Sequence, residues 1–301
     1  MNLLVEQYET IPITKEISMT GVSSAGIMTS FIFKPFNFMI DFGSRTNKTS
    51  TVGFLTHQHS DHSLMIPNFC SSNKEMTKTL VIPVESYEII CGFIKSRYLL
   101  NHPEMYGITD SALRSLLNFK IIPAYPGQII NSDVLSNDST KRFPFNVEVL
   151  QAYHSVMSLG YGFSTVKRKL KPEAKEFIKE SKIQSMKDAL DNFEMVNGEA
   201  YNYDVKYEFV FYCDSSIHNL IKHDEWKKYP VVICECTGFQ KISNGTVYKE
   251  GHTKIGELIP IMLENIDKKW ILIHTNHYTP KEEKEELCNE IKSMGVDLTF
   301  V

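Results

Sequence analysis

The sequence predicts an α+β protein in which two sheets pack between outer helices, an αββα sandwich. In the first half of the 301 residues, short apolar runs bounded by turn residues indicate strands. In the second half, such runs alternate with helical patterns. Because both halves mix strands with helices, a sandwich of two such layers is favoured over a single doubly wound sheet. We find no repeat or low-complexity linker, so we expect one domain over residues 1–301.

The expected strands are short apolar runs, and several of them end at a polar residue. They span residues 29–34, 37–41, 52–56, 79–83, 119–124, 145–154, 205–214, 231–236, 270–274 and 296–301. The first two are separated by Pro35, as in a hairpin. The expected helices are amphipathic or rich in helix-favouring charged residues. They span residues 84–96, 109–118, 172–191, 216–223, 253–265 and 281–294.

Composition and charge exclude several classes of protein. The chain is 42% hydrophobic and 23% charged, which is ordinary for a soluble globular protein. The N-terminus lacks a secretory signal and no apolar stretch could span a bilayer, so we expect no membrane partner and a cytoplasmic location, with nucleus and organelles left open. Six scattered cysteines indicate reduced thiols. A net charge of −4 gives no global sign of nucleic-acid binding, so a polyanion would need a local patch.

The strongest signal is a group of metal-binding side chains in T-H-Q-H-S-D-H, residues 56–62. Three imidazoles and a carboxylate this close together suit a borderline-soft divalent cation such as zinc. Because the group directly follows an apolar run, we expect it on a loop at the end of a strand. His57 and His59 can converge on one ion, while Asp61 and His62 can face a second.

Three later residues can complete a site for two ions. His154, Asp214 and His274 each end an apolar strand. Any one of them alone could be an ordinary polar residue at a strand terminus. Their placement matches that of the 56–62 segment, and this favours metal ligation by all three.

These residues, in this order, resemble the metal pattern of the metallo-β-lactamase superfamily and, more closely, of its tRNase Z branch, which trims tRNA 3′ ends. Four further segments carry the resemblance to that branch and to its short plant-type members. They are residues 154–163 (H-S-V-M-S-L-G-Y-G-F, like H-x-x-x-S-x-G-Y), 234–237 (C-E-C-T, like the HEAT motif), 251–253 (G-H-T, like the histidine loop) and 161–173. The resemblance covers nearly the whole chain.

The resemblance implies a metallo-β-lactamase fold that holds two Zn²⁺ ions per chain, with Mn²⁺ or Fe²⁺ also compatible with the ligands. It assigns His57, His59 and His154 to the first ion, Asp61, His62 and His274 to the second, and Asp214 as a bridge between them. It also implies that Glu235 and His252 handle the proton of the leaving group, and that Asp61 orients or deprotonates the attacking water. The implied reaction is attack of a metal-activated hydroxide on a phosphodiester, leaving a 3′-OH on the tRNA.

A basic segment is the candidate RNA contact. Residues 167–187 hold eight Lys and Arg against three Glu, a net charge of +5. We expect a basic helical insertion over residues 167–200 that contacts pre-tRNA through Lys167, Arg168, Lys169 and Lys171. A solvated helix with Glu/Lys pairs is the alternative interpretation. The long Gly/Pro-rich arm of bacterial relatives is not evident, and His277 stands where relatives have arginine.

Two other functions remain open. One is hydrolysis of a small molecule such as a lactam, lactone or thioester, possible alongside promiscuous RNase activity because an exposed metal hydroxide is unselective. The other is a non-catalytic RNA-binding relative, which is disfavoured because all seven expected ligands are present. A homodimer is common in the resembling family, but no heptad or apolar patch in the sequence demonstrates one.

Overall fold

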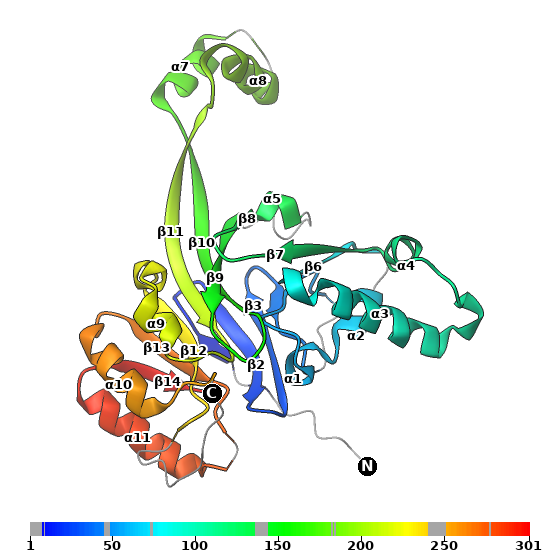
Figure 1. The fold of residues 1–301 in the computed structure, drawn as a ribbon. Coiled ribbons are helices and arrows are strands. Elements are labelled where there is room, and N and C mark those ends of the chain that lie inside the picture. The colour runs from blue at the N-terminus through cyan, green and yellow to red at the C-terminus, as the bar shows by residue number, and fades with distance from the viewer. Residues whose placement is uncertain are drawn as a thin grey trace.

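The computed structural model describes residues 8, 10–44, 49–72, 75–135, 144–181, 183, 185–239, 251–276 and 278–301. Two sheets of seven strands pack face to face (Figure 1). The first holds β1 (Thr10–Pro12), β2 (Ser18–Ser24), β3 (Met28–Lys34), β4 (Phe38–Ile40), β5 (Val52–Phe54), β6 (Lys78–Pro83) and β7 (Phe119–Ala124). The second holds β8 (Ile129–Asn131), β9 (Phe145–Ala152), β10 (Ser158–Leu170), β11 (Tyr201–Tyr212), β12 (Val231–Glu235), β13 (Lys269–Ile273) and β14 (Asp297–Phe300).

The two sheets share one pattern of strand pairing. In the first, β1 to β4 pair antiparallel and β4 to β7 pair parallel. In the second, β8 to β11 pair antiparallel and β11 to β14 pair parallel. Each half of the chain therefore builds one mixed sheet, and the α+β sandwich predicted from the sequence is confirmed.

Most of the helices lie on the outer sides of the two sheets, and two of them lie at the tip of an arm that extends from the second sheet (Figure 1). Those of the first half are α1 (Ser60–Ser63), α2 (Ile66–Ser71), α3 (Tyr87–Asn101), α4 (Asp110–Leu117) and α5 (Ser132–Leu135), with 3-10 turns at Val84–Ser86 and Pro103–Met105. Those of the second half are α7 (Pro172–Glu180), α8 (Met186–Asn197), α9 (His218–Lys222), α10 (Ile255–Glu264) and α11 (Lys281–Ser293), with a 3-10 turn at Glu225–Lys228. Within the described residues, we find no helix both long and apolar enough to cross a membrane.

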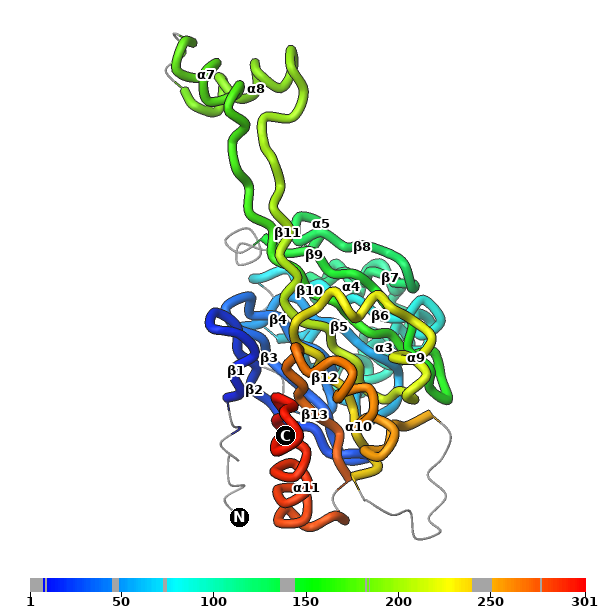
Figure 2. The backbone as a smooth tube through the Cα atoms, turned by 90° about the vertical axis from the view of Figure 1, so that its left-hand side faces the viewer, coloured from blue at the N-terminus to red at the C-terminus, as the bar shows by residue number. Residues whose placement is uncertain are grey.

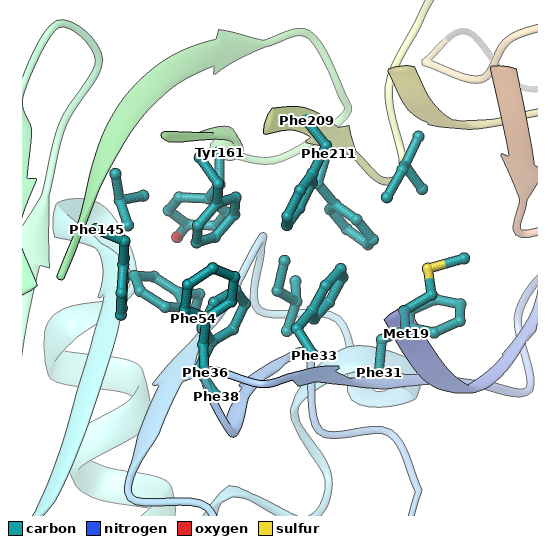
Figure 3. Close-up of a cluster of buried hydrophobic side chains, with 14 of the residues drawn as sticks. Met19, Phe31, Phe33, Phe36, Phe38, Phe54, Phe145, Tyr161, Phe209 and Phe211 are labelled. Carbon is teal, nitrogen blue, oxygen red and sulfur yellow. The ribbon is translucent and has the colours of Figure 1, made fainter. Parts of the chain in front are cut away.

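An aromatic core fills the space between the two sheets (Figure 3). Phe33 of β3 stacks on Phe209 of β11 with ring centroids 5.1 Å apart. Phe38 of β4 stacks on Phe163 of β10 at 4.7 Å. These rings are fully buried, and burial of each stabilises the sandwich by roughly 1.5–3 kcal/mol. The core therefore fixes how the loops of one sheet meet those of the other.

The second sheet carries an arm, formed by the distal halves of β10 and β11 with α7 and α8 at the tip (Figures 1 and 2). The two strands pair as far as Leu170 and Tyr201. Their proximal residues are buried and most of their distal residues are exposed. Phe193 packs on Ala174 and Ala200 to give the tip a small core of its own. The arm thus holds a folded tip away from the sandwich.

The structure corrects several expected elements. The predicted helix over residues 172–191 is two helices, because the chain is extended at Ser181 and Ser185 and Ser185 begins α8 by accepting a hydrogen bond from the Asp188 N–H. Residues 167–170 belong to β10 and not to a helical insertion. An arm is present although none was evident in the sequence. Strands β1, β2, β8 and β10 were not expected, since their residues lack a clear apolar run.

Candidate metal centre

The expected ligands follow the carboxyl ends of strands and meet at one edge of the sandwich. Residues 57–62 come after β5, His154 follows β9, Asp214 follows β11, and His274 follows β13. Gly43 lets this loop approach closely, because a Cβ there would overlap the Asp61 carbonyl. The structure therefore brings together all seven residues that the sequence singled out.

Four of these residues form a first group. His57 Nε2 lies 3.1 Å from His59 Nδ1, and His154 Nε2 lies 3.3 Å from the same atom. Asp214 Oδ2 is 3.6 Å from His57 Nε2 and 3.8 Å from His154 Nε2. All four ligand atoms lie within 4.8 Å of one another, close enough to surround one cation.

A second group shares Asp214 with the first. The other oxygen, Asp214 Oδ1, lies 3.0 Å from His274 Nε2 and 3.4 Å from His62 Nε2. Asp61 Oδ2 lies 3.4 Å from His62 Nε2 and 3.7 Å from His274 Nε2. Each oxygen of the Asp214 carboxylate thus faces a different group, which is the arrangement of a bridging ligand.

The histidine rings are oriented by hydrogen bonds on the side away from the groups. Carboxylate and carbonyl oxygens only accept, so a ring nitrogen facing one carries the proton. The hydroxyls of Thr56 and Thr237 donate their protons to Asp41 and Glu235, so they too accept from the ring nitrogens that face them. The contacts are His57 Nδ1 to Thr56 Oγ1 (3.1 Å), His62 Nδ1 to Asp41 Oδ2 (2.8 Å), His154 Nδ1 to the Gly251 carbonyl (3.0 Å) and His274 Nδ1 to Thr237 Oγ1 (3.1 Å). The lone pair of each Nε2 therefore points into the centre, as metal ligation requires.

Two buried nitrogens test whether the residues fit a metal ion. Among the residues that the structure describes, His62 Nε2 and His274 Nε2 are buried and find no hydrogen-bond partner, although each lies near two carboxylates. A buried polar atom without a partner costs about 1–3 kcal/mol, so it calls for an explanation. Coordination of a cation by both nitrogens would satisfy them and offset the charge of Asp61 and Asp214. The residues of the centre therefore fit a bound metal ion.

The charges in the centre are strongly coupled. Burial alone would raise the pKa of Asp214, but the imidazoles of His62 and His274 outweigh it and hold that pKa well below its usual range. Burial would also raise the pKa of Asp61, but the neighbouring imidazoles of His274 and His62 outweigh it and hold that pKa well below its usual range. Burial lowers the pKa of His57. The centre thus places ionised carboxylates beside closely spaced imidazoles. The negative charge of the carboxylates attracts cations.

A carboxylate–histidine pair borders the metal groups. Glu235, the last residue of β12, is buried, and its Oε1 accepts a hydrogen bond from His252 Nδ1 at 3.0 Å. The same oxygen accepts from the backbone N–H groups of Ser215 (2.8 Å) and Thr253 (3.2 Å). Burial lowers the pKa of His252, but the hydrogen bond and charge of Glu235 prevail and raise it above 6.5. The pair is therefore built to keep a proton on His252.

The loop after β13 places its ligand in a strained backbone conformation. His274 has φ 56°, the left-handed region that a non-glycine residue seldom adopts. The buried ammonium of Lys284 holds the loop by donating to Thr275 Oγ1 (2.8 Å) and the Asn276 carbonyl (2.7 Å). Thr237 Oγ1 contacts His274 Nδ1 and donates to Glu235 Oε2 at 2.6 Å, so one hydroxyl links the last ligand to the carboxylate–histidine pair. His277 lies outside the described residues.

One supporting residue was missed by the sequence analysis. Asp41 follows β4 and is completely buried beneath the centre. Its carboxylate accepts from His62 Nδ1 at 2.8 Å and from the Thr56 backbone N–H at 2.8 Å. Its position at the end of an apolar strand, next to the strand that leads into His57, is the signal that could have identified it.

We expect Asp41→Asn to weaken binding of the second ion about 10–100-fold, because the amide has only one accepting oxygen for the Thr56 N–H and His62 Nδ1 and lacks the negative charge beside that ring. Titration of metal-free protein with Zn²⁺ measures this directly. Asp133→Asn, at an exposed carboxylate at the base of the arm, is the control. Unchanged affinity in Asp41→Asn would contradict the orienting role.

Comparison with protein-family models and with curated proteins gave no match. Among solved structures, the metallo-β-lactamase fold protein YhfI from Bacillus subtilis is similar, with 14% identity, 95% of each chain covered and a TM-score of 0.55. A diphosphatase of the PhnP family shows 10% identity, 95% and 94% coverage and a TM-score of 0.52. A long-form RNase Z from yeast shows 15% identity over 95% of this chain and 38% of that chain, with a TM-score of 0.49, too low to support an argument. The likeness to YhfI confirms that the chain has the metallo-β-lactamase fold.

Proposed function

We propose that this chain is a two-metal phosphodiesterase of the tRNase Z type, which cuts the 3′ extension from a tRNA precursor and leaves a 3′-hydroxyl on the tRNA. The observation that carries the proposal is the Glu235–His252 pair beside two groups of ligands that share Asp214. Hydrolysis of a thioester expels a stabilised thiolate without such a proton donor, whereas a 3′ oxygen leaving phosphorus is a poor leaving group unless it is protonated.

The metal ions belong to the two groups already described. His57, His59, His154 and Asp214 would hold one, and Asp61, His62, His274 and Asp214 the other. The mixed imidazole and carboxylate set suits zinc, and Mn²⁺ or Fe²⁺ are compatible with it. When bound, such a pair supplies Lewis-acid activation of water and neutralises charge on the phosphate.

The protein's own side chains supply orientation and a proton. Asp61 keeps 14% of its side chain exposed and therefore faces the space that an attacking water would enter. His252 Nδ1 is engaged by Glu235, so its Nε2 is the nitrogen that can hold a proton for the leaving oxygen. Asp61 would orient the attacking water and His252 would protonate the leaving oxygen, so the two roles fall to residues from different segments of the chain.

The arm supplies a surface for RNA. Lys167, Lys171 and Lys175 lie on the end of β10 and the start of α7, and no described residue forms an ion pair with them. Arg168 and Lys169 are also exposed, but each faces an acid, Asp133 at 3.5 Å and Asp204 respectively. Phosphates attracted to such lysines release counterions, so binding should weaken with salt. Lys182 lies outside the described residues.

We expect the triple variant Lys167→Gln, Lys171→Gln, Lys175→Gln to raise KM for the precursor with little change in kcat, because only distant phosphate contacts are lost. The slope of log(kcat/KM) against log[salt] should become shallower by roughly 2–3, about one unit for each lost contact. The matched control replaces Lys15, Lys281 and Lys292, which lie on the sandwich. An unchanged slope in the arm variant would show that these lysines do not contact RNA.

The function itself is tested with a 3′-extended tRNA transcript and metal-loaded protein, with and without chelator, mapping both product ends. The expected products are a tRNA with a 3′-hydroxyl and a trailer with a 5′-phosphate, formed only when metal is present. An intact transcript in the presence of about two bound ions per chain would refute the proposal. Turnover of a lactam, lactone or thioester under the same conditions would then favour small-molecule hydrolysis.

A further inference from the structure

A cavity of about 660 Å³ lies beside the candidate metal centre. The residues that line it include His154 and His252, together with Tyr153, Ser216, His218 and Lys254. The volume lies within the range of small-ligand sites, about 300–1,000 Å³. A substrate reaching the centre can therefore place one of its units in this cavity.

Lys254 is the basic side chain that lines the cavity, and its stem is fixed by the backbone. The Gly238 N–H donates to the Thr253 carbonyl (3.1 Å), and the Ile255 N–H donates to the Gly238 carbonyl (2.9 Å). A Cβ at Gly238 would lie only 2.9 Å from Lys254 Cγ, so the lysine stem packs flat on that glycine. The sequence around the expected histidine loop, G-H-T-K, thus places a lysine two residues from the proposed proton donor.

The ammonium of Lys254 is left available for a ligand. Within the part of the chain that the structure describes, no carboxylate forms an ion pair with it. Glu257 also lines the cavity, but its carboxylate accepts a hydrogen bond from the Lys254 backbone N–H at 3.1 Å. The acid is therefore tied to the start of α10 and does not neutralise the lysine.

The position of His252 decides which part of the RNA enters the cavity. This step rests on the proposed function, in which His252 protonates the departing 3′ oxygen. That oxygen belongs to the last nucleotide kept by the tRNA, so the sugar of this nucleotide must lie against His252. Two residues of extended chain span at most about 7 Å, so the Lys254 side chain begins within one nucleotide of that sugar.

We propose that the cavity binds the nucleotide on the 5′ side of the cut, and that Lys254 pairs with the phosphate that joins this nucleotide to the one before it. The hydroxyl of Ser216 and the imidazole of His218, 3.2 Å apart, add hydrogen-bonding groups for the base or sugar. Lys254 is thereby a specificity-determining residue that sets the position of the cut by holding the neighbouring phosphate.

The test pairs a protein change with a substrate change. Two tRNA precursors are prepared that differ only at the linkage one nucleotide 5′ of the cut, a normal phosphate in one and an uncharged methylphosphonate in the other. In the unaltered protein the methylphosphonate should lower kcat/KM about tenfold, the value of one charge-assisted contact. Lys254→Met should lower kcat/KM by a similar factor on the normal precursor, with no further loss on the methylphosphonate.

Two further variants serve as controls. Lys254→Arg keeps the charge and should remain sensitive to the methylphosphonate, while Lys292→Met on the outer end of α11 should behave as the unaltered protein. The inference is overturned if the methylphosphonate costs the unaltered protein and Lys254→Met the same factor, or if Lys254→Met cuts the normal precursor at full rate. If the unaltered protein leaves the normal precursor intact, the proposed function itself is wrong. That result differs from the two results that overturn only the role of Lys254.

Discussion

The Asp214→Ala variant is expected to bind less than one metal ion per chain. It should cleave the tRNA precursor more slowly by a factor of roughly 10³ or more, because two ions contribute several kcal/mol of transition-state stabilisation. Asp214 is the residue common to both ligand groups, with one carboxylate oxygen facing each. Its loss therefore weakens both sites together, whereas loss of His59 would touch only the first. The measurement is metal content by elemental analysis, together with the rate of precursor cleavage.

The control for this variant is Asp204→Ala, at an exposed carboxylate on the arm that pairs with Lys169. It should keep about two ions per chain and full activity on a small phosphodiester. Thermal melting with and without chelator separates lost binding from lost folding. If Asp214→Ala kept two ions, the bridging role would be wrong.

The two groups of potential metal ligands could be predicted from the sequence because their residues lie where local patterns are easy to detect. Residues 57–62 supply four candidate side chains in one short segment, which the structure divides between a loop and helix α1, and each of the others follows an apolar strand. The ends of strands from both sheets meet at one edge of the sandwich, so separate positions in the sequence can be combined. Asp41 was not identified from the sequence because a single carboxylate at a strand end carries no such local signal. Its role depends on its contact with His62.

The arm could not be predicted for a different reason. The distal part of β10 reads V-K-R-K-L, with no alternation of buried and exposed residues, because both faces of the hairpin are largely solvent-exposed there. Its strand conformation comes from pairing with β11, 31 to 39 residues further along the chain, and not from its own side chains. The Gly and Pro content expected of an arm is equally absent. Pairing between strand segments that lie far apart in the chain cannot be read from a single sequence.

The site and the fold are linked through neighbouring strands of the second sheet. β11 and β12 are parallel, so Asp214 after the first and Glu235 at the end of the second lie side by side. The Ser215 N–H donates to Glu235 Oε1, which joins the loop of the shared ligand to the proton-handling pair. Thr253 Oγ1 donates to the Ser215 carbonyl at 2.7 Å and ties the His252 loop to the same point. Asp214 and the Glu235–His252 pair are therefore positioned by one network of hydrogen bonds.

His252→Ala should lower cleavage of the tRNA precursor roughly 10²–10⁴-fold, the usual contribution of a general acid, with metal content unchanged. Hydrolysis of bis(p-nitrophenyl) phosphate should fall far less, because nitrophenolate leaves without a proton. His102→Ala, at the exposed end of α3, is the matched histidine control. An equal loss on both substrates would instead assign His252 to binding or folding and remove the main argument for a nuclease.

The pH profile gives an independent reading of the same residue. A general acid works in its protonated form, so the rate should fall as pH rises through the pKa of His252. The hydrogen bond and charge of Glu235 overcome burial and raise that pKa above 6.5, which keeps the acid protonated further into the neutral range. Glu235→Gln removes the charge, so the alkaline limb should move to lower pH while the limb for bis(p-nitrophenyl) phosphate stays in place. If both limbs moved together, the carboxylate would be acting on the attacking water and not on the leaving oxygen.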